Sequence, residues 1–119
     1  MLTRRGEDDF VASGYALVVR FTLRDTSAAR QFDELVARTI EGIRGEAGTL
    51  VYSVHTPVDE PLVRVFYELY ADRDAFQAHE DQAHTRRFLE AREELLSSVD
   101  VTFLDELEAL SKRPGTEQV

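Results

Sequence analysis

The sequence contains no cysteine among its 119 residues, no tryptophan and only three prolines. Without cysteine, the chain can have no disulfide framework, no thiolate nucleophile and no iron–sulfur ligands. It also lacks long hydrophobic runs, and no apolar stretch approaches the roughly 20 residues that a membrane-spanning helix needs. The basic pair Arg4 and Arg5 is followed by acidic residues instead of the apolar run of a secretory signal. We therefore expect a cytoplasmic protein.

Basic residues are scarce relative to acidic ones. The chain has 14 Lys and Arg against 23 Asp and Glu, which gives a formal net charge of −9. Nucleic-acid binding needs clustered Lys and Arg to neutralise phosphates, so we expect no nucleic-acid partner. The same charge argues against adsorption to an anionic membrane. An anionic substrate would need a local basic patch.

The length allows a single domain, which we place at residues 14–107. A flexible lead-in at 1–13 and a polar tail at 108–119 flank it. Stretches dense in Val, Leu, Phe and Tyr predict strands, and apolar residues at i, i+3, i+4 spacing predict helices. The expected strands are 14–23, 49–57, 62–71 and 98–107, and the expected helices are 28–46, 72–79 and a run from 82 onward.

This order of elements, β-α-β-β-α-β, predicts an α+β fold of the ferredoxin-like class. Such a unit has a four-stranded antiparallel sheet with its helices on one face.

The first and third expected strands are apolar on both sides. Leu17, Val19 and Phe21 alternate with Ala16 and Val18. A sheet with one solvated face should instead alternate apolar and polar residues. Helices can cover only one face, and a second copy of the chain is the simplest cover for the other. We therefore predict a homodimer packed sheet to sheet.

Metal and nucleotide sites lack support in the sequence. His79 and His84 are five residues apart, about 140° around a continuous helix, so they would not share a face. The strand around His55 offers no further ligand pattern, and zinc or non-haem iron needs three or four convergent donors. No nucleophile elbow surrounds a serine, and the six glycines are scattered. We therefore predict no metal site and no Rossmann or P-loop cofactor.

The third strand carries a row of charged and aromatic residues on one face: Arg64, Phe66, Glu68 and Tyr70. Its aromatic neighbours should partly desolvate the Glu68 carboxylate and raise its pKa. Two readings remain open for Glu68: an internal ion pair with Arg64 or Arg20, or a direct role in chemistry. His79 is open in the same way, between a buried hydrogen-bonded residue and an acid–base group near neutral pH.

Two motifs resemble signatures of the antibiotic biosynthesis monooxygenase family. The segment EAGTLVYSV, residues 46–54, is similar to the family's E-x-G-x-x-x-Y-x-V motif. The second motif is a strand ending in E-x-aromatic, then D-x-x-A-x-x-x-H and, five residues on, another H. Its residues here are Glu68, Tyr70, Asp72, Ala75, Phe76, His79 and His84. The similarity runs from about residue 15 to 107, and the two motifs together indicate the family but not one activity.

The resemblance implies a dimeric α+β barrel with a pocket in each subunit, between sheet and helices. Some members oxidise polycyclic phenols to quinones with O2 and no flavin, haem or metal. By this resemblance the protein is a cofactor-independent monooxygenase for a phenolic or polyketide-like aromatic. Its expected catalytic residues are His79, Glu68 and Tyr70. The expected substrate-binding residues are Tyr52, Phe66, Phe76 and His84, with Arg64 or Arg20 stabilising the phenolate anion.

The chain also departs from the family's patterns. Quinone-forming and haem-degrading members often carry tryptophan where this chain has Tyr70. Phe88 and Leu89 occupy the region of the haem-ligating histidine, and Arg20 lies near an asparagine position. Two alternatives stay open: an isomerase or degrading enzyme for a small metabolite, phosphorylated or not, and a non-catalytic small-molecule-binding dimer. An apolar pocket would favour the oxygenase, and a wet pocket with two arginines pointing inward would favour the isomerase. A pocket filled by the protein's own side chains would favour the non-catalytic dimer.

Overall fold

The computed structural model describes residues 13–114, which form one sheet with its helices on one side. The strands are β1 (Gly14–Leu23), β2 (Thr49–His55), β3 (Val63–Tyr70) and β4 (Leu96–Glu106). The helices are α2 (Thr26–Ile43), α3 (Arg73–Glu80) and α4 (Ala83–Ala91), with short 3-10 turns at Glu93–Leu95 and Glu108–Leu110. The predicted α+β, ferredoxin-like order is confirmed. The outer parts of the expected lead-in and tail, residues 1–12 and 115–119, lie outside the described residues.

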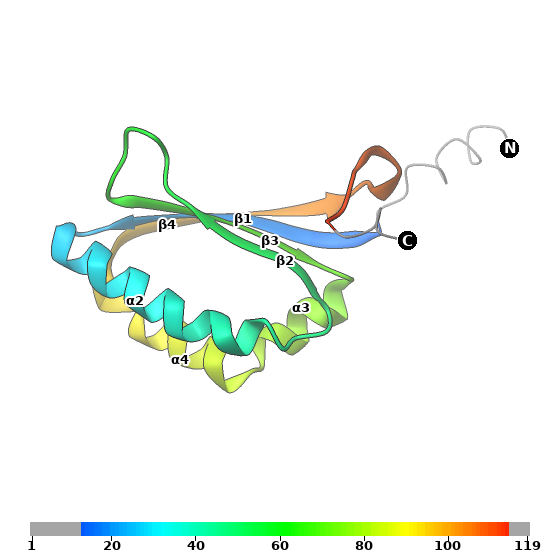
Figure 1. The fold of residues 1–119 in the computed structure, drawn as a ribbon, viewed down its shortest axis with the longest axis horizontal. Helices are drawn as coiled ribbons and strands as arrows, with labels where there is room; N and C mark the ends of the chain where they lie inside the picture. The colour runs from blue at the N-terminus through cyan, green and yellow to red at the C-terminus, as the bar shows by residue number, and fades with distance from the viewer. Residues whose placement is uncertain (1–12, 115–119) are drawn as a thin grey trace, which may run out of the picture.

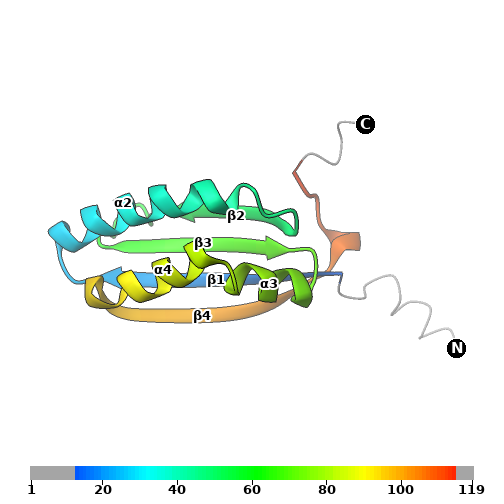
Figure 2. The same cartoon turned by 90° about the horizontal axis from the view of Figure 1, so that it is seen from below.

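The four strands form an antiparallel sheet in the order β2-β3-β1-β4. The two long central pairings set Leu17 of β1 opposite Glu68 of β3 and Phe103 of β4. All three helices lie under one face of this sheet (Figure 1). Seen from the helix side, α2 runs along the β2 side, while β4 forms the opposite margin beyond α3 and α4 (Figure 2).

Side-chain caps fix where two of the helices begin. Asp25 accepts a hydrogen bond from the backbone N–H of Ala28 at 2.8 Å, and Asp72 accepts one from Ala75 at 2.8 Å. An aspartate at this position satisfies one of the free N–H groups of the first turn. The Asp72 cap matters for function because α3 carries His79 on its last turn.

The core lies between the helices and the sheet. Phe21, Phe32, Phe66 and Phe88 interlock there, with ring centroids 4.8 Å apart for Phe21–Phe66 and 5.7 Å for Phe32–Phe88. Edge-to-face and tilted pairs of this kind add to the stabilisation that burial alone provides. The aromatic cluster joins β1 and β3 to α2 and α4, and it closes one end of the space beneath the sheet.

The opposite face of the sheet carries no helix. Ala16 and Val18 of β1 lie there beside Leu69 and Tyr67 of β3 and Leu104 of β4. The segment after β4 crosses one end of this face, where Arg113 donates to Glu106 at 2.6 and 3.1 Å. Leu104 is still 38% exposed.

No helix among residues 13–114 is long and apolar enough to cross a membrane.

Candidate functional site

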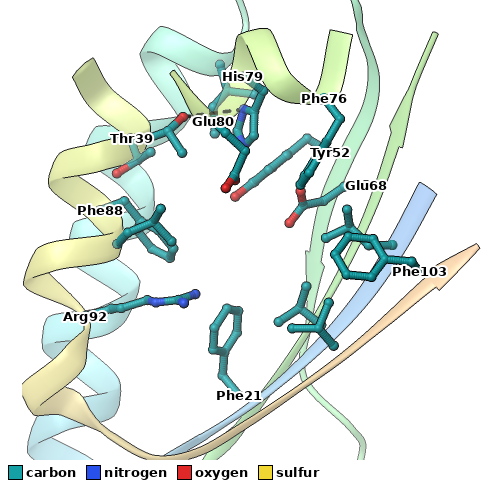
Figure 3. A pocket seen from close by; sticks show the side chains of 16 residues that line it. Phe21, Thr39, Tyr52, Glu68, Phe76, His79, Glu80, Phe88, Arg92 and Phe103 are labelled. Carbon is teal, nitrogen blue, oxygen red and sulfur yellow. Dashed lines mark hydrogen bonds between the residues drawn. The ribbon is translucent and has the colours of Figure 1, made fainter. Parts of the chain in front are cut away.

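A cavity of about 150 Å³ lies between the sheet and the helices. Its walls are mainly apolar side chains from β1, β4 and the helices: Leu17, Val19, Phe21, Ile43, Phe76, Phe88, Leu89, Val101 and Phe103. Val101 and Phe103 are 47% and 53% exposed, so the cavity opens along the β4 margin that the helices leave uncovered. Figure 3 shows the labelled polar side chains arranged around this space.

Ionisable groups reach the cavity from three elements and from the residue that follows α4. Tyr52 comes from β2, Glu68 from β3, His79 and Glu80 from α3, and Arg92 from the residue that follows α4. No two of the first three are close in sequence, so the fold brings them together. The result is an apolar space with ionisable groups around it, the usual composition of a small-molecule site.

Glu68 is a buried acid on the cavity wall. It is 6% exposed, and the Tyr70 hydroxyl donates a hydrogen bond to its Oε1 atom at 2.6 Å. Burial raises the pKa of Glu68 to about 7, although the hydrogen bond from Tyr70 works in the opposite direction. Burial also raises the pKa of Tyr70, and Glu68 raises it further. Near neutral pH, Glu68 can therefore both release and accept a proton.

The two arginines expected in the pocket lie elsewhere. Arg20 projects from the other face of β1, because its neighbours Val19 and Phe21 face the helices, and it pairs with Glu60 at 2.6 Å. Arg64 shares the inner face with Glu68, but four residues of strand separate them by about 13 Å. It binds the Asp33 carboxylate of α2 at 2.9 and 3.0 Å. Neither arginine lines the cavity or pairs with Glu68, so the expectation that they stabilise a bound anion is corrected.

The two motif histidines have different positions. His79 is 5% exposed and lines the cavity, whereas His84 does not line it. Both contact one carboxylate, that of Glu46 in the segment between α2 and β2. The His79 Nδ1 atom lies 2.9 Å from Glu46 Oε1, and His84 Nε2 contacts Glu46 Oε2. His84 is thus a partner of Glu46 and not a wall of the cavity.

Glu46 was part of the first sequence motif, yet sequence reasoning gave it no role. Its separation of 33 positions from His79 offered no sign that the two would meet. Burial raises the pKa of the Glu46 carboxyl, but hydrogen bonds from Thr49, His84 and His79 outweigh burial, so the pKa falls below its usual value. Glu46 is therefore ionised at neutral pH.

Arg92 is the cavity residue that sequence reasoning missed. Its guanidinium points toward the centre of the cavity (Figure 3) and lies 5.2 Å from the Phe21 ring centroid and 5.8 Å from that of Phe88. Burial lowers the pKa of Arg92, and the charge of Glu80 partly offsets this. No carboxylate of residues 13–114 lies within 4.0 Å of it. Its spacing of four from Phe88 on a helical run was the signal available.

The expected aromatic residues divide between the wall and the core behind it. Tyr52 and Phe76 line the cavity, and burial raises the pKa of Tyr52 well above its ordinary value. Phe66 and Tyr70 are both 0% exposed and do not line it. Phe66 packs in the core cluster, and Tyr70 acts through its hydrogen bond to Glu68. Within residues 13–114, no three His, Asp or Glu side chains are grouped to hold a metal ion.

The family model for antibiotic biosynthesis monooxygenase matches residues 14–91, about two thirds of the sequence. The chain belongs to this family. Its membership indicates a monooxygenase-like or small-molecule-binding role and leaves the substrate open. No curated protein matches the sequence significantly.

Solved structures of similar shape come from several bacteria. Rv0793 of Mycobacterium tuberculosis is 29% identical, covers 83% of this chain and all of its own length, and has a TM-score of 0.75. PA3566 of Pseudomonas aeruginosa is 24% identical, with 81% and 96% coverage and a TM-score of 0.73. SO0527 of Shewanella oneidensis is 23% identical, with 81% and 93% coverage and a TM-score of 0.74. The last two likenesses concern the fold alone.

Proposed function

We propose that the protein is a cofactor-independent monooxygenase that binds a phenolic aromatic in the cavity and oxidises it to a quinone with O2. One observation carries this proposal: a largely apolar cavity holds His79, Glu68 and Arg92 on its wall. The apolar lining suits an aromatic ring, and the polar groups suit removal of a proton and stabilisation of the resulting anion. A wet pocket with Arg20 and Arg64 turned inward would have favoured a different chemistry, and neither arginine lines the cavity.

The cavity volume limits what enters. A cavity of about 150 Å³ lined by Leu, Ile and Phe accommodates one benzene ring, so the enclosed space here suits a single ring. Further fused rings would extend through the opening along β4. Phe103 lines that opening and stacks on Tyr15, with centroids 5.7 Å apart and planes 18° apart. A flat polycyclic phenol would meet aromatic faces along this path.

The proposed reaction starts with loss of a proton. His79, or Glu68, takes the proton of the phenol hydroxyl, and the Arg92 guanidinium stabilises the phenolate. The electron-rich phenolate then supplies the electrons that O2 requires. For an anthrone-type ring, the CH2 group becomes C=O, one oxygen atom enters the product and the other leaves as water. Substrate and O2 together provide every atom and electron of this balance.

The homodimer forms part of the same proposal. The outer face of the sheet carries Ala16, Val18, Tyr67, Leu69 and Leu104 with no helix over it. Leu104 is 38% exposed, whereas Ala16 and Leu69 are each 2% exposed. An apolar sheet face without a helix over it suits contact with a second protein surface. Packing against the same face of a second copy buries the apolar sheet face of both chains at once.

Arg92 favours a second candidate function. A guanidinium with no carboxylate of the described residues within 4.0 Å suits a small anionic metabolite, and His79 could then move a proton within that metabolite as an isomerase does. The two candidates differ in their need for O2. Turnover without oxygen consumption would identify the isomerase.

The first test is oxygen consumption by metal-stripped protein with 1,8-dihydroxyanthrone and with catechols. We expect uptake above the uncatalysed rate that a chelator does not change. His79→Ala should lower kcat by about 10²–10⁴-fold, the usual contribution of a proton-transfer group. His55→Ala is the matched control because His55 is exposed on β2, away from the cavity. Equal uptake by wild type and His79→Ala would contradict the role of His79.

A further inference from the structure

The Glu46 carboxylate joins two histidines that belong to different helices. His79 is on α3 and His84 on α4, and each contacts a different oxygen of Glu46. Thr49 also donates to Oε1 at 2.6 Å. The Glu46 and His79 side chains are 9% and 6% exposed, and that of His84 is 16% exposed. The cluster is therefore nearly buried, and its three members hold one another in place.

The charge of Glu46 determines where the ring protons lie. An ionised carboxylate has no hydrogen to donate, so each histidine nitrogen that faces it must carry the hydrogen. His79 is then protonated at Nδ1 and His84 at Nε2. In a neutral imidazole only one nitrogen carries a hydrogen. The Nε2 atom of neutral His79 therefore has a free lone pair.

That lone pair opens into the cavity. No residue of the described chain hydrogen-bonds to Nε2 of His79, and no buried side-chain nitrogen or oxygen in residues 13–114 lacks a partner. Nε2 must therefore touch accessible space. His79 lines the cavity, and the Glu46 contact occupies the opposite nitrogen, which leaves Nε2 directed at a bound ligand.

We propose that Glu46 and His84 are positioning residues that hold His79 as a proton acceptor, with Nδ1 protonated and Nε2 open to the ligand. The proposal rests on the proposed function, in which the ligand hydroxyl supplies the proton. That proton moves to Nε2, the Nδ1 hydrogen stays on the ring, and the new positive charge faces the Glu46 carboxylate. A carboxylate behind a histidine serves the same purpose in serine hydrolases.

His84 holds the Glu46 carboxylate from the side opposite His79. Its hydrogen bond occupies the second oxygen of Glu46, so the carboxylate cannot rotate away from His79. The His84 ring lies against Gly42 of α2, where any side chain would overlap it. Glycine at position 42 therefore gives the ring its space.

The other groups around His79 do not compete for its Nδ1 proton as strongly. The Tyr52 and Tyr70 rings lie beside the imidazole at tilted angles, with centroids 5.8 and 5.2 Å away. The Thr85 hydroxyl of α4 lies 3.5 Å from Nδ1, farther than the Glu46 oxygen at 2.9 Å. Glu80 and Glu68 also face this space, from α3 and β3, and no hydrogen bond joins either to His79.

The test is nitrogen-15 NMR of the imidazole rings in untagged protein, without any ligand. The chain has only three histidines, so the rings can be assigned from single substitutions, and His55 serves as an internal reference. Spectra across pH 5–9 report which nitrogen carries the hydrogen. We expect neutral His79 to be protonated at Nδ1 and His84 at Nε2. A His79 ring protonated at Nε2 would overturn the proposal.

The variant Glu46→Gln tests the carboxylate itself. An amide presents one acceptor and one donor group, so at least one of the two rings must change its protonated nitrogen, while His55 stays unchanged. Glu41→Gln, at an exposed position on α2, is the matched control. Unchanged His79 and His84 signals in Glu46→Gln would also overturn the proposal. If this variant does not fold, the wild-type spectrum still decides.

The oxygen assay separates this inference from the proposed function. We expect Glu46→Gln to lower kcat by about 10–100-fold with little change in KM, because proton transfer is impaired and ring binding is not. No uptake by wild type together with the expected NMR spectra would reject the oxygenase and leave the positioning intact. Uptake by wild type with the opposite tautomer, or an undiminished Glu46→Gln rate, would reject the positioning alone.

Discussion

The ionisable side chains in and beside the cavity are shielded from water, unlike those on the surface of the protein. Glu68 loses solvation and its pKa rises, whereas hydrogen bonds hold the pKa of Glu46 down despite its burial. Arg92 stays cationic beside the Phe21 and Phe88 rings. One site therefore contains a fixed anion, a fixed cation and an acid that titrates near neutral pH. Separated pKa values of this kind are typical of sites that move protons.

The titration of Glu68 predicts a pH-dependent stability. Its pKa is about 7 in the folded protein and 4.5 for an unburied glutamate, so the folded state binds the proton more tightly. The free energy of unfolding should fall as pH rises from about 4.5 to about 7, by roughly 3 kcal/mol from this group. Urea unfolding at pH 5 and pH 8 should show this loss in wild type and a smaller one in Glu68→Gln. Equal losses in the two proteins would contradict the assignment.

Arg92 should control the binding of anionic ligands. Hydrogen bonds to charged groups contribute about 1.5–3 kcal/mol, so Arg92→Gln should weaken binding of a phenolate by about 10–100-fold. A phenol whose absorbance shifts on ionisation reports both affinity and the pKa of the bound form by titration. Arg87→Gln, at an exposed position on α4, is the control. Unchanged phenolate affinity in Arg92→Gln would show that the guanidinium does not contact the ligand.

At the scale of the elements, the two family motifs contact each other at a pair of small residues. Gly48 precedes β2 and Ala75 lies in the first turn of α3, and a Cβ atom at position 48 would lie only 2.6 Å from that of Ala75. The glycine of the first motif and the alanine of the second thus allow α3 to pack closely against the segment that carries Glu46. This approach brings Glu46 within hydrogen-bond distance of His79. The Asp72 cap fixes the start of the same helix.

Gly48→Ala should therefore disturb both packing and the site. Extra atoms in a well-packed contact cost about 1–3 kcal/mol, and α3 would move away from Glu46. Urea unfolding should show that loss of stability. Gly45→Ala is the matched control, because a Cβ there meets only a backbone oxygen at an ordinary 3.5 Å. Similar stability in the two variants would contradict the packing argument.

The whole molecule has two unlike surfaces. One face of the sheet is covered by three helices and encloses the cavity. The other carries apolar strand residues with no helix over them, of which Leu104 is 38% exposed. The cavity opens at the β4 margin, and Leu104 of the same strand faces the opposite side. The proposed dimer contact and the cavity opening therefore share β4, so association would fix the strand that forms one wall of the opening.

Substitution on the outer face should separate the proposed dimer. Wild-type protein should sediment or elute with light scattering as a dimer of the 13.5 kDa chain. Leu104→Asp places a charge in the contact and should give monomers at micromolar concentration, since an unpaired buried charge costs several kcal/mol. Val58→Asp, at a position 98% exposed in the loop between β2 and β3, should remain dimeric. Monomeric wild type would rule out the sheet-to-sheet dimer.

The sequence by itself determined the elements, their order and the family, because each depends on local patterns. Stretches dense in apolar residues predicted the strands, apolar residues at i, i+3, i+4 spacing predicted the helices, and the two motifs indicated the family. It also predicted the raised pKa of Glu68 from its aromatic neighbours. The predicted dimer and the activity still await their tests.

Only the tertiary structure decided which side chains converge at the site. Arg92 and Glu46 lie far from their partners along the chain, and nothing local tells which strand and helix faces will meet. The prediction that Arg20 or Arg64 lies in the cavity was wrong. Strand alternation predicts which face of the sheet a side chain lies on. It does not predict how far along the strand the cavity extends, or that Asp33 would bind Arg64. Convergence of distant residues depends on how the layers pack, and that packing is a property of the whole fold.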